Sequence, residues 1–528
     1  MTTTPWTTEF LERLAAEGVR AERRALAALA PVQAVDVAAD DWGKLGAAAK
    51  AAGCRYVAGF GDDTGDALAV YACFEREGVY LLARTTVART APRLASHAPL
   101  FAAAERAERH TRDMLGFVFE GHPDPRRWTR HRAWSEDEYP LRKDFPAGGR
   151  ASGATPADND YPFLNAHGSG VHEIPVGPVH AGIIEPGHFR FLAVGESVLH
   201  LEARLGYVHK GIEKIAEGRD AAGLARLAAR VSGDTTIGHS LAACLAMERA
   251  AGIEAPARAV WLRAVMAERE RIANHLGDIG AILNDVAFAF GFYQFGRLRE
   301  QWQRTSQRAF GHRFMMDRIV PGGVAVDLAA AHVAEMQGEL QALRRELAGL
   351  LAIYRDTPSV EDRVVTTGVL APATARELGV LGFVGRASGV DFDVRRDAPY
   401  PPYGELRVRV PVYREGDVAA RLRVRAEEIA ASIDLLEELL RNLPDGPVRT
   451  PWRDPSAPAE GLAIVEGWRG EIFAYVRFGA DGRIARYFPR DPSALNWPAL
   501  EHLIHDNIVP DFPVCNKSVN GSYSGNDL

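Results

Sequence analysis

The stretch Pro256–Asp285, PARAVWLRAVMAERERIANHLGDIGAILND, decides how most of this chain is expected to fold. Its apolar side chains recur at the spacing of one helix face, at Val260, Leu262, Val265, Ile272, Leu276, Ile279 and Leu283. Pro256 stands where a helix can begin, and the pattern is long enough to cross a whole domain. Similar patterns at 333–354 and 421–440 predict two more helices. We therefore expect a helical bundle in this part of the chain.

Strand patterns flank the helical region on both sides. They lie at 189–194, 198–205, 461–468, 471–478 and 484–488. Asp481-Gly482 is a typical hairpin turn between the last two of these segments. The second part of the chain is thus predicted to be mostly helical, with strands at its two ends.

The beginning of the chain mixes both patterns. Residues 10–15 have helical spacing, residues 79–87 are typical of a strand, and residues 91–115 are expected to form a second helix. Residues 25–30 are rich in Ala, and the stretch at 146–165, rich in Gly, Pro and Ala, is the clearest linker. The predicted fold class is α+β, with a small N-terminal α/β domain at 1–145, a linker at 146–165 and a mostly helical domain at 166–528.

Composition excludes several classes of protein. Among 528 residues, 47% are apolar and 25% charged, the balance of a globular protein rather than a disordered, collagen-like or disulfide-stabilised chain. A net charge of -7 argues against nucleic acid as a partner. No apolar run of membrane-spanning length and no signal-peptide pattern occur, which predicts a cytosolic protein or one held at a membrane by partners.

Cysteine usage excludes a self-contained metal site. Four cysteines are spread along the chain without a CxxC spacing: Cys54, Cys73, Cys244 and Cys515. A zinc or iron–sulfur site formed by this chain alone is therefore not expected. Cys515 is better explained as a small buried hydrophobe than as a nucleophile, because no His partner is implied.

Three stretches are dense in polar groups. Residues 177–188 place two His and Glu185 on a Gly- and Pro-rich turn, where a buried carboxylate could transfer protons; the alternative is a solvated turn. Residues 206–214 carry both charge signs and could equally be a solvated helix start. The segment 507–527 is either a free tail or, given its two prolines and Cys515, a tail held inside the fold.

Long motifs resemble two subunits of respiratory complex I. Residues 112–127 and 139–145 strongly resemble the closing motif of its 30 kDa subunit. Matches to the 49 kDa subunit, and to the large subunit of NiFe hydrogenases, lie at 177–180, 206–214, 268–276, 386–391, 399–403 and 466–471. The fusion of both in one chain resembles the large subunit of group 4 membrane-bound hydrogenases of the formate hydrogenlyase and hydrogenase-4 type.

This resemblance implies nickel ligands that the chain lacks. The family's four Cys thiolates correspond to Ser232, Thr235, Ser522 and Gly525, and Cys244 and Cys515 lie off both motifs. Hydroxyls do not replace soft thiolates in such a centre. We expect no NiFe centre and no metal ligands, with these four positions lining the cavity left behind. The sequence ends three residues after Gly525, so we also expect no cleavable tail of the kind that the resemblance implies.

The quinone contacts implied by complex I are altered too. The His and Tyr that bind the headgroup there correspond to Ile184 and Leu227, which cannot donate hydrogen bonds to a quinone carbonyl. Asp285, matching the carboxylate that pairs with that His, is present.

Groups associated with proton handling remain. Glu185 resembles the proton-gate Glu of hydrogenases, and Arg469 resembles the Arg that overhangs their active site. Other residues within or beside matching motifs are His180, His209, Lys210, Glu213, His239, Asp391 and Asp393. Together these features are similar to the cysteine-less, hydrogenase-related energy-converting complexes. We take Glu185, Arg469, His180, His209 and Asp285 as the candidate catalytic residues.

The resemblance predicts a large subunit of a membrane-associated, NADH-quinone oxidoreductase-like complex. Electrons would come from a 4Fe-4S cluster in a small iron–sulfur subunit and go to a quinone or an unidentified acceptor. A ferredoxin-like subunit and antiporter-like membrane subunits would be further partners. This chain would lie peripherally at the cytoplasmic face of the membrane. NAD binding is implied only by the name of the family. No GxGxxG motif follows a predicted strand in this sequence, so we do not expect NADH to bind this chain.

Two other hypotheses remain. One is a non-catalytic scaffold that docks the small subunit and couples it to the membrane arm. The other, a hydrogenase with an oxygen-ligated metal, is disfavoured by the Ser and Thr replacements. A substrate site predicts a closed apolar cavity around Ser232, Glu185, Arg469 and Ser522, whereas a scaffold predicts that side chains fill that space.

Overall fold

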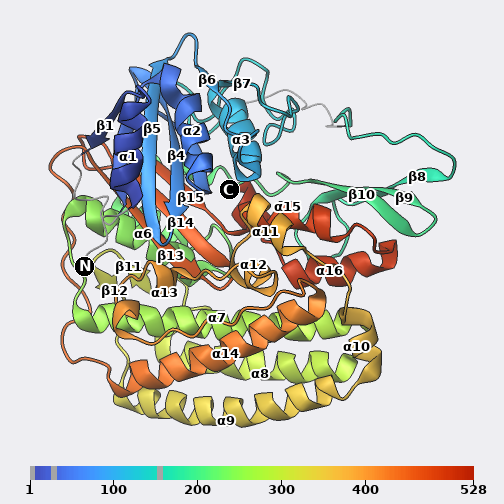
Figure 1. The fold of residues 1–528 in the computed structure, drawn as a ribbon. Coiled ribbons are helices and arrows are strands. Elements are labelled where there is room, and N and C mark those ends of the chain that lie inside the picture. Colours follow the sequence, from blue (N-terminus) through green and yellow to red (C-terminus); the bar gives the residue numbers. More distant parts are fainter. Residues whose placement is uncertain (1–5, 25–31, 151–158) are drawn as a thin grey trace.

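The computed structural model describes residues 6–24, 32–150 and 159–528. Two β-rich regions lie above a layer of long helices, and a small sheet projects to one side (Figure 1). The expected α+β fold, with a small N-terminal sheet domain, a mostly helical middle region and strands near the C-terminus, is confirmed. The Ala-rich stretch at 25–30 lies outside the described residues, and the domain boundary at 146–165 stays a prediction.

The N-terminal region is a five-stranded sheet with helices on one face. Its strands lie in the order β1-β2-β5-β4-β3 and are β1 (Ala21–Arg24), β2 (Gln33–Val37), β3 (Arg55–Asp63), β4 (Ala67–Arg76) and β5 (Val79–Ala88). β2 and β5 run parallel, and the other neighbours are antiparallel. Helices α1 (Trp6–Ala16) and α2 (Trp42–Ala51) cover one face of the sheet (Figure 1). The strand predicted at 79–87 and the helix around 10–15 are confirmed.

The helix expected at 91–115 is wrong in its first half. α3 spans only Glu105–Leu115, while β6 (Arg93–Ala95) pairs with β7 (Val118–Glu120). Pro99 explains the difference, because a proline within a helix removes a hydrogen bond and clashes with the preceding turn. The Glu108 carboxylate instead accepts hydrogen bonds from Ser96 Oγ at 2.5 Å and His97 N at 2.7 Å, which holds the extended segment against α3.

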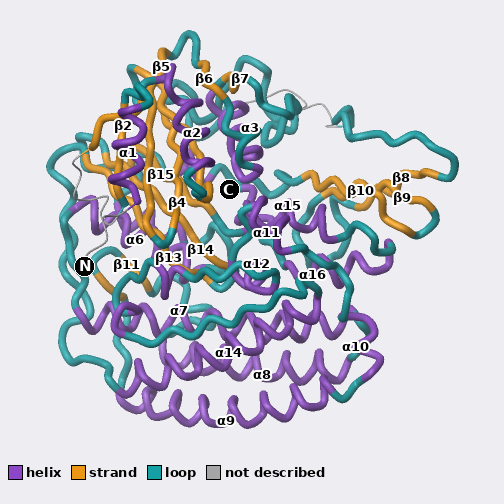
Figure 2. Tube along the Cα trace, viewed as in Figure 1, coloured by secondary structure: helices purple, strands orange, loops and turns teal. Residues whose placement is uncertain are grey.

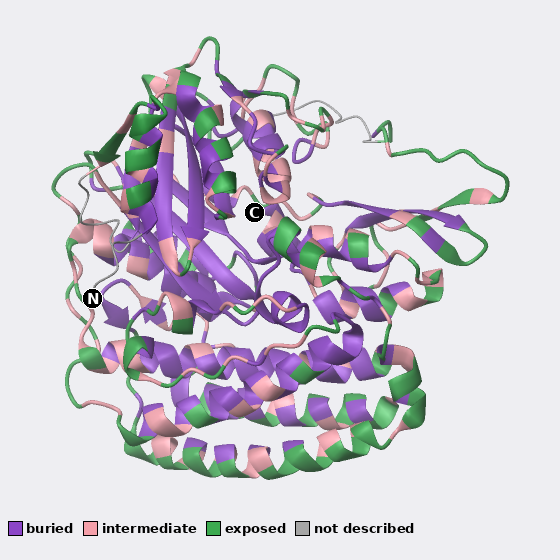
Figure 3. Cartoon of the chain, in the orientation of Figure 1, coloured by how far each residue is buried: buried purple, intermediate pink, exposed green. Residues whose placement is uncertain are grey.

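Long helices form the opposite layer of the molecule. They are α6 (Thr236–Ala251), α7 (Ala257–Asp285), α8 (Ala289–Phe310), α9 (Ala330–Arg355) and α14 (Val418–Arg441). α7 packs against both α8 and α14, whereas α9 is largely exposed at the base (Figure 3). The helices predicted from 256, at 333–354 and at 421–440 are thus confirmed as α7, α9 and α14.

Shorter helices connect these layers. They are α4 (Ile212–Ile215), α5 (Ala221–Ala228), α10 (Pro358–Val364), α11 (Pro372–Leu378), α12 (Gly382–Ala387) and α13 (Val394–Asp397). Long loops join them along the front of the helical layer (Figure 2).

Strands occur at both ends of the helical region, as predicted. The projecting sheet has the order β10-β9-β8 and consists of β8 (Val171–Val176), β9 (His188–Val194) and β10 (Ser197–Arg204). The second sheet is an antiparallel meander of β13 (Ala459–Gly467), β14 (Gly470–Phe478) and β15 (Ile484–Arg490). A two-residue hairpin, β11 (Ile319–Val320) and β12 (Gly323–Val324), lies beside α6 and α7.

The C-terminal segment is held inside the fold, as one of the two alternatives proposed. The segment 507–527 follows α15 (Ser493–Leu503) and forms α16 (Phe512–Val519) and α17 (Tyr523–Asp527), and the end of the chain lies between the N-terminal region and α15 (Figure 1). Leu528 O accepts hydrogen bonds from Lys210 N at 2.9 Å and Ile212 N at 3.1 Å. Cys515 is fully buried, and this burial raises the pKa of its thiol to about 12.

The N-terminal sheet and the C-terminal meander share one core. Phe60 of β3 stacks between Tyr71 and Phe488, with ring centroids 4.6 and 4.5 Å away. Beside it, Glu471 from β14 is fully buried and forms an ion pair of 2.7 Å with Arg55. The first region is therefore packed onto the second rather than tethered to it.

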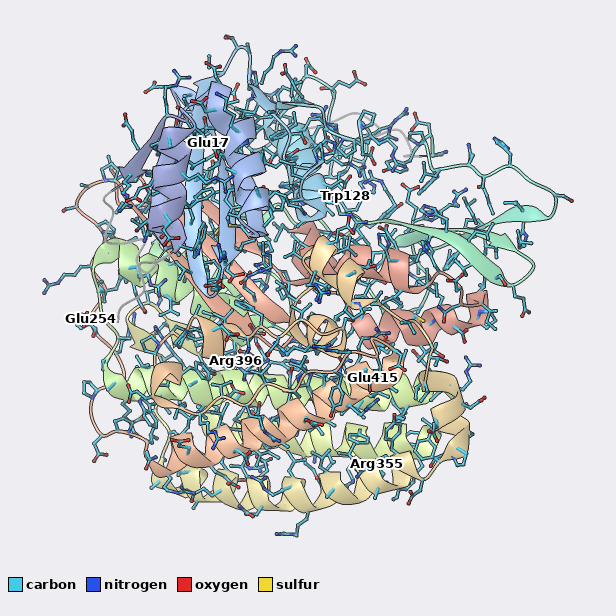
Figure 4. All side chains as sticks on the ribbon, in the orientation of Figure 1. Glu17, Trp128, Glu254, Arg355, Arg396 and Glu415 are labelled. Atoms are coloured by element: carbon cyan, nitrogen blue, oxygen red, sulfur yellow. The ribbon has the colours of Figure 1, made fainter. Side chains whose placement is uncertain are left out.

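A second contact between the regions centres on Trp128, labelled in Figure 4. Arg106 and Arg109 of α3 stack over its indole ring, 4.6 and 5.1 Å from the centroid. Arg106 also pairs with Glu501 of α15 at 2.8 Å. Cation–π contacts and ion pairs thus complement the apolar core.

We predict that Phe60→Ala destabilises both regions together. Loss of a fully buried aromatic ring costs about 3–5 kcal/mol of unfolding free energy. Urea unfolding followed by tryptophan fluorescence would measure this loss. The control is Tyr293→Ala, since Tyr293 is 69% exposed and its loss should change stability by less than about 0.5 kcal/mol. Equal effects of the two substitutions would contradict the shared core.

Candidate functional site

The four positions that correspond to the lost thiolates lie together. Ser232 and Thr235 belong to the loop before α6, and Ser522 and Gly525 belong to the start of α17. Ser232 Oγ and Ser522 Oγ are 2.8 Å apart and hydrogen bonded. Ser522 Oγ also accepts from Gly525 N at 2.9 Å, which caps α17.

Arg469 closes this cluster from the hairpin between β13 and β14. Its guanidinium forms two hydrogen bonds to the Asp234 carboxylate, of 2.7 and 2.6 Å, and its Nε donates to Asn520 O at 2.6 Å. The side chain is only 3% exposed and stacks on Trp468. The hairpin turns sharply here, with Gly470 at φ +131°, a conformation that favours glycine.

Asp234 was not identified from the sequence. It lies between Ser232 and Thr235 and accepts hydrogen bonds from both hydroxyls, at 2.8 and 3.1 Å. Burial alone would raise the pKa of this carboxyl, but the Arg469 guanidinium holds the pKa below its usual value. In the sequence, the only sign of a role for Asp234 is its position between two hydroxyl residues. Nothing in the sequence indicates that Arg469 is its partner.

Glu185 and His180 lie on an exposed loop beside the cluster. Glu185 is exposed in this chain, yet its Oε2 accepts a hydrogen bond from Ser524 N at 2.9 Å. His180 Nε2 and Tyr523 OH are 3.2 Å apart. The loop also exposes Ile183, at 97%. The loop is thus exposed, as the solvated-turn alternative predicts. The side chains of Glu185 and His180 nevertheless contact α17.

Residues 206–214 pack against the end of the chain. His209 Nδ1 is 2.6 Å from Asp527 O, and burial lowers the pKa of this imidazole. Lys210 Nζ donates to Ser524 O at 2.9 Å, and partial desolvation lowers the pKa of its ammonium. Glu213 is buried and bonds to His110 Nε2 at 2.7 Å. The alternative of a solvated helix start is therefore wrong for Glu213.

A buried His–Asp pair lies behind the cluster. This pairing was not predicted from the sequence. His239 Nε2 and Asp491 Oδ2 are 2.9 Å apart, and both side chains are fully buried. Burial would raise the pKa of Asp491, but the bond to His239 holds it far below the usual value. Asp491 also lies against Gly525, since a Cβ added there would be 2.7 Å from Asp491 Cγ.

Other candidate residues lie apart from this cluster. Asp285 ends α7, where burial raises its pKa, and it takes part in none of the cluster's hydrogen bonds described above. Asp393 is buried and pairs with Arg395 at 2.7 Å. Asp391 is exposed and pairs with Arg396. The structure thus groups most candidates around α17 but separates these three carboxylates.

A buried charge network supports the cluster from the helical layer. Its members are Glu268, Arg271 and His275 on α7, Arg386 on α12, Asp393 and Arg395 at α13, Glu428 on α14 and Glu466 on β13. Every member of the network is at most 3% exposed. Buried charges of this kind are tolerated only when paired, so the network constrains how the helices pack.

Two small cavities adjoin the cluster. One of about 80 Å³ lies between the N-terminal region and the end of the chain, where His110, Asp491 and Gly525 contribute to its wall. The other, of about 20 Å³, lies beside Asp234 and Glu270. Ser232 and Ser522 line neither of these two cavities, and their hydroxyl groups bond directly to each other.

Glu270 is a buried carboxyl beside the site with a raised pKa. It accepts hydrogen bonds from Ile237 N at 2.7 Å and Gly238 N at 3.0 Å at the start of α6. Burial raises its pKa from 4.5 to about 8 despite these bonds. It is therefore mainly protonated at neutral pH.

We predict a pH-dependent stability that Glu270→Gln removes. The folded chain keeps a proton that the unfolded chain releases between pH 4.5 and about 8, so this group's contribution to stability falls as the pH rises through that window. One such proton gives a slope of at most about 1.4 kcal/mol per pH unit. Urea unfolding at several pH values would measure it, with Glu346→Gln as the exposed control. A slope unchanged in Glu270→Gln would contradict the prediction.

Within the described residues, no three His, Cys, Asp or Glu side chains converge as a metal ion would require. Nor does any helix in the described part of the chain combine the length and apolar character needed to cross a bilayer.

Three protein families match parts of the chain. The respiratory-chain NADH dehydrogenase 30 Kd subunit matches residues 35–151, and the 49 Kd subunit matches residues 285–460. Nickel-dependent hydrogenase matches residues 210–277, which include Ser232 and Thr235.

Relatives match most of the chain. Formate hydrogenlyase subunit 5 of Escherichia coli (strain K12) is 33% identical over 450 residues, which are 85% of this chain and 79% of that protein. The C/D subunit of the NADH-quinone oxidoreductase of Phocaeicola vulgatus is 31% identical, covering 77% of this chain and 81% of that protein.

A solved structure is also similar. A chain of the membrane-bound sulfane sulfur reductase, an archaeal respiratory membrane complex, aligns with a TM-score of 0.64 at 27% identity. The alignment covers 68% of this chain and 98% of that chain.

Proposed function

Because this chain belongs to the family of fused 30 kDa and 49 kDa-type subunits that includes formate hydrogenlyase subunit 5, we propose that it is an oxidoreductase subunit without a NiFe centre. Its relatives are subunits of membrane-bound hydrogenase or complex I type complexes, which implies partner subunits. In this proposal an iron–sulfur cluster of a small partner subunit donates electrons to a quinone or another small acceptor. The complex would also include a ferredoxin-like subunit and antiporter-like membrane subunits, and this chain would lie peripherally at the cytoplasmic face of the membrane.

The observation that carries the proposal is the direct bond between Ser232 and Ser522. Two thiolates that share a metal ion at about 2.3 Å each lie roughly 3.8 Å apart. The two hydroxyl oxygens are hydrogen bonded at 2.8 Å, and hydroxyls do not replace the soft thiolates of such a centre. A side chain at position 525 would also collide with Asp491. These residues therefore do not fit a NiFe centre.

The acceptor would bind at the outer side of the cluster. The inner side is filled by the Arg469–Asp234 pair, whereas the loop with Glu185 and Ile183 is exposed in this chain. An exposed apolar loop beside a carboxylate suits a small apolar acceptor that takes up protons when reduced. The sulfane sulfur reductase relative makes a sulfur compound a second acceptor class worth testing.

The filled cluster also favours the scaffold as a second candidate function. A substrate site at the former metal position predicts an apolar cavity with Ser232 and Ser522 in its wall, yet these side chains satisfy each other. As a scaffold, the chain would dock the iron–sulfur partner and transmit conformational change without binding an acceptor.

We predict no nickel and a stoichiometric quinone in the purified complex. Elemental analysis, quinone extraction with mass spectrometry and a hydrogen-uptake assay would measure both. One nickel per chain with hydrogen uptake would contradict the absence of a NiFe centre at Ser232 and Ser522. Neither nickel nor quinone, with no turnover of quinone or polysulfide, would favour the scaffold.

We predict that Glu185→Gln abolishes proton-coupled turnover of the complex. Gln cannot accept or release a proton but keeps the hydrogen bond from Ser524 N. The measurement is quinone or polysulfide reduction by the whole complex. Glu173→Gln is the matched control, because Glu173 is an exposed carboxylate on β8 that pairs with Arg190. Normal turnover in Glu185→Gln would remove Glu185 from the mechanism.

A further inference from the structure

A groove rich in arginine lies beside α3 and β7 in the N-terminal region (Figure 1). Its volume is about 810 Å³, and none of the residues of the cluster at Ser232 line it. Sites for small molecules usually measure about 300–1,000 Å³. Five arginines contribute to its wall: Arg112, Arg126, Arg127, Arg130 and Arg132. We call this groove the arginine groove.

Three of these arginines pair with carboxylates of the same region. Arg126 Nη2 donates to Asp124 Oδ2 at 2.7 Å. Arg127 Nη2 donates to one oxygen of Asp160 at 2.8 Å, and Arg132 pairs with the other oxygen. The Asp160 side chain is 52% exposed, so water screens these two contacts. The chain itself thus supplies an anionic partner for each of the three.

The charge of Arg112 is less well compensated. Its Nη1 and Nη2 donate to backbone oxygens, of Asp124 at 3.2 Å and of Arg126. These bonds use two of the five N–H groups of a guanidinium. Among the described residues Arg112 pairs with one carboxylate, Asp113, whose Oδ1 lies 3.6 Å from Arg112 Nε. Burial lowers the pKa of Arg112, so the distant carboxylate does not offset the loss of water around this charge.

Arg130 forms no ion pair within the part of the chain that the structure describes. It donates to three backbone oxygens, those of Ser135 at 3.0 Å, Asp113 at 2.9 Å and Glu138 at 3.0 Å. Arg130 is only 9% exposed, and its Nε has no hydrogen-bond partner among the described residues. Because Arg112 and Arg130 both contact Asp113, their guanidinium groups lie close together.

The other carboxylates of the wall do not neutralise these two guanidinium groups. Asp113 Oδ2 already accepts backbone N–H groups, from Trp128 at 2.6 Å and Thr129 at 2.9 Å. Glu108 is bonded to the extended segment before α3, and burial raises its pKa to about 7. Glu136 is exposed. The groove therefore holds two adjacent, partly buried cations that an anionic ligand would stabilise.

Aromatic side chains also line the groove, namely Phe117, Phe119, Trp134 and Tyr139. The guanidinium groups of Arg130 and Arg142 lie over the Tyr139 ring, 5.5 and 4.4 Å from its centroid. Trp134 is half-buried, and its ring lies 6.0 Å from that of His209. Aromatic faces stack on nucleobases of any sequence. The wall thus combines cations with a surface for a flat ring.

We propose that the arginine groove binds a small molecule through a diphosphate group, with Arg112 and Arg130 as the main contacts. A guanidinium matches phosphate oxygens with paired, charge-assisted hydrogen bonds, and two neighbouring guanidinium groups suit two linked phosphates. The diphosphate can belong to a nucleoside diphosphate, whose base would stack on the aromatic wall, or to free pyrophosphate. This inference does not depend on the proposed function, because it uses none of the residues around Ser232.

Equilibrium dialysis of the whole purified complex against labelled ADP and labelled pyrophosphate tests the proposal. We expect both to bind, and adenosine, which has no phosphate, not to compete. Arg112→Gln should weaken both on the order of 10-fold, because it removes charge-assisted hydrogen bonds. ADP bound more tightly than pyrophosphate would assign the nucleotide as the ligand, whereas equal affinities would assign the diphosphate alone.

A second variant, Asp160→Asn, should have the opposite effect. It removes the carboxylate that pairs with Arg132, so that this guanidinium can turn to the ligand, and the affinity for both diphosphates should rise several-fold. Arg132→Gln carries the test if Arg112→Gln does not assemble, since the Arg132 side chain is 40% exposed, and it should weaken binding. The matched control is Arg93→Gln. Arg93 is exposed, pairs with Glu120 outside the groove, and should leave binding unchanged.

Three results would overturn the proposal. The first is no binding of either diphosphate to the wild-type complex. The second is the same affinity in the wild type, Arg112→Gln and Asp160→Asn, which would place the diphosphate at another site. The third is binding of a polyglutamate peptide without binding of ADP or pyrophosphate, which would assign the groove to an acidic protein partner. Dialysis measures no electron transfer, so a complex that reduces no quinone would contradict the proposed function and leave this test intact.

Discussion

The ion pair between Arg469 and Asp234 is the interaction on which the site depends. It joins the hairpin of β13 and β14 to the loop before α6, and through Asn520 O it also holds the segment before α17. These three segments are far apart in the sequence. Arg469 is only 3% exposed, so removal of Asp234 would leave its charge buried without this partner, whereas the Asp234 carboxylate, at 35%, keeps some contact with solvent. The cluster around Ser232 therefore has its shape only while this pair is intact.

The position of Arg469 depends in turn on the charged interior of the helical layer. α7 carries Glu268, Arg271 and His275 on one face, at the i, i+3 and i+7 positions of a helix, and each of them pairs or bonds with a neighbouring element. Arg271 also donates to Glu466 O and Gly467 O, just before the turn that presents Arg469. The long helix thus fixes the hairpin, and the hairpin fixes the arginine.

Periodic patterns made much of the fold predictable, whereas long-range contacts left no local signal. α7, α9 and α14 follow from apolar spacing. The prediction for 91–115 failed because Pro99 interrupts the helix, and the buried Glu108 then holds the extended part against α3. In the site, family motifs grouped the Ser232 and Ser522 positions, and the structure brings them together. Asp234, Glu270 and the role of Asp491 came only from the structure, because their partners lie 32 to 252 residues away.

The exchange of thiol positions for hydroxyls changes what this interior can do. A thiol is a weak hydrogen-bond donor, so thiol groups hold a shared metal better than they hold each other. Hydroxyls form short, directional bonds, and here they draw the two segments to 2.8 Å. The buried Arg469 guanidinium needs an anionic partner, which Asp234 supplies from the loop that also carries Ser232. With hydroxyls at these positions, the interior is held together by hydrogen bonds and by the Arg469–Asp234 pair.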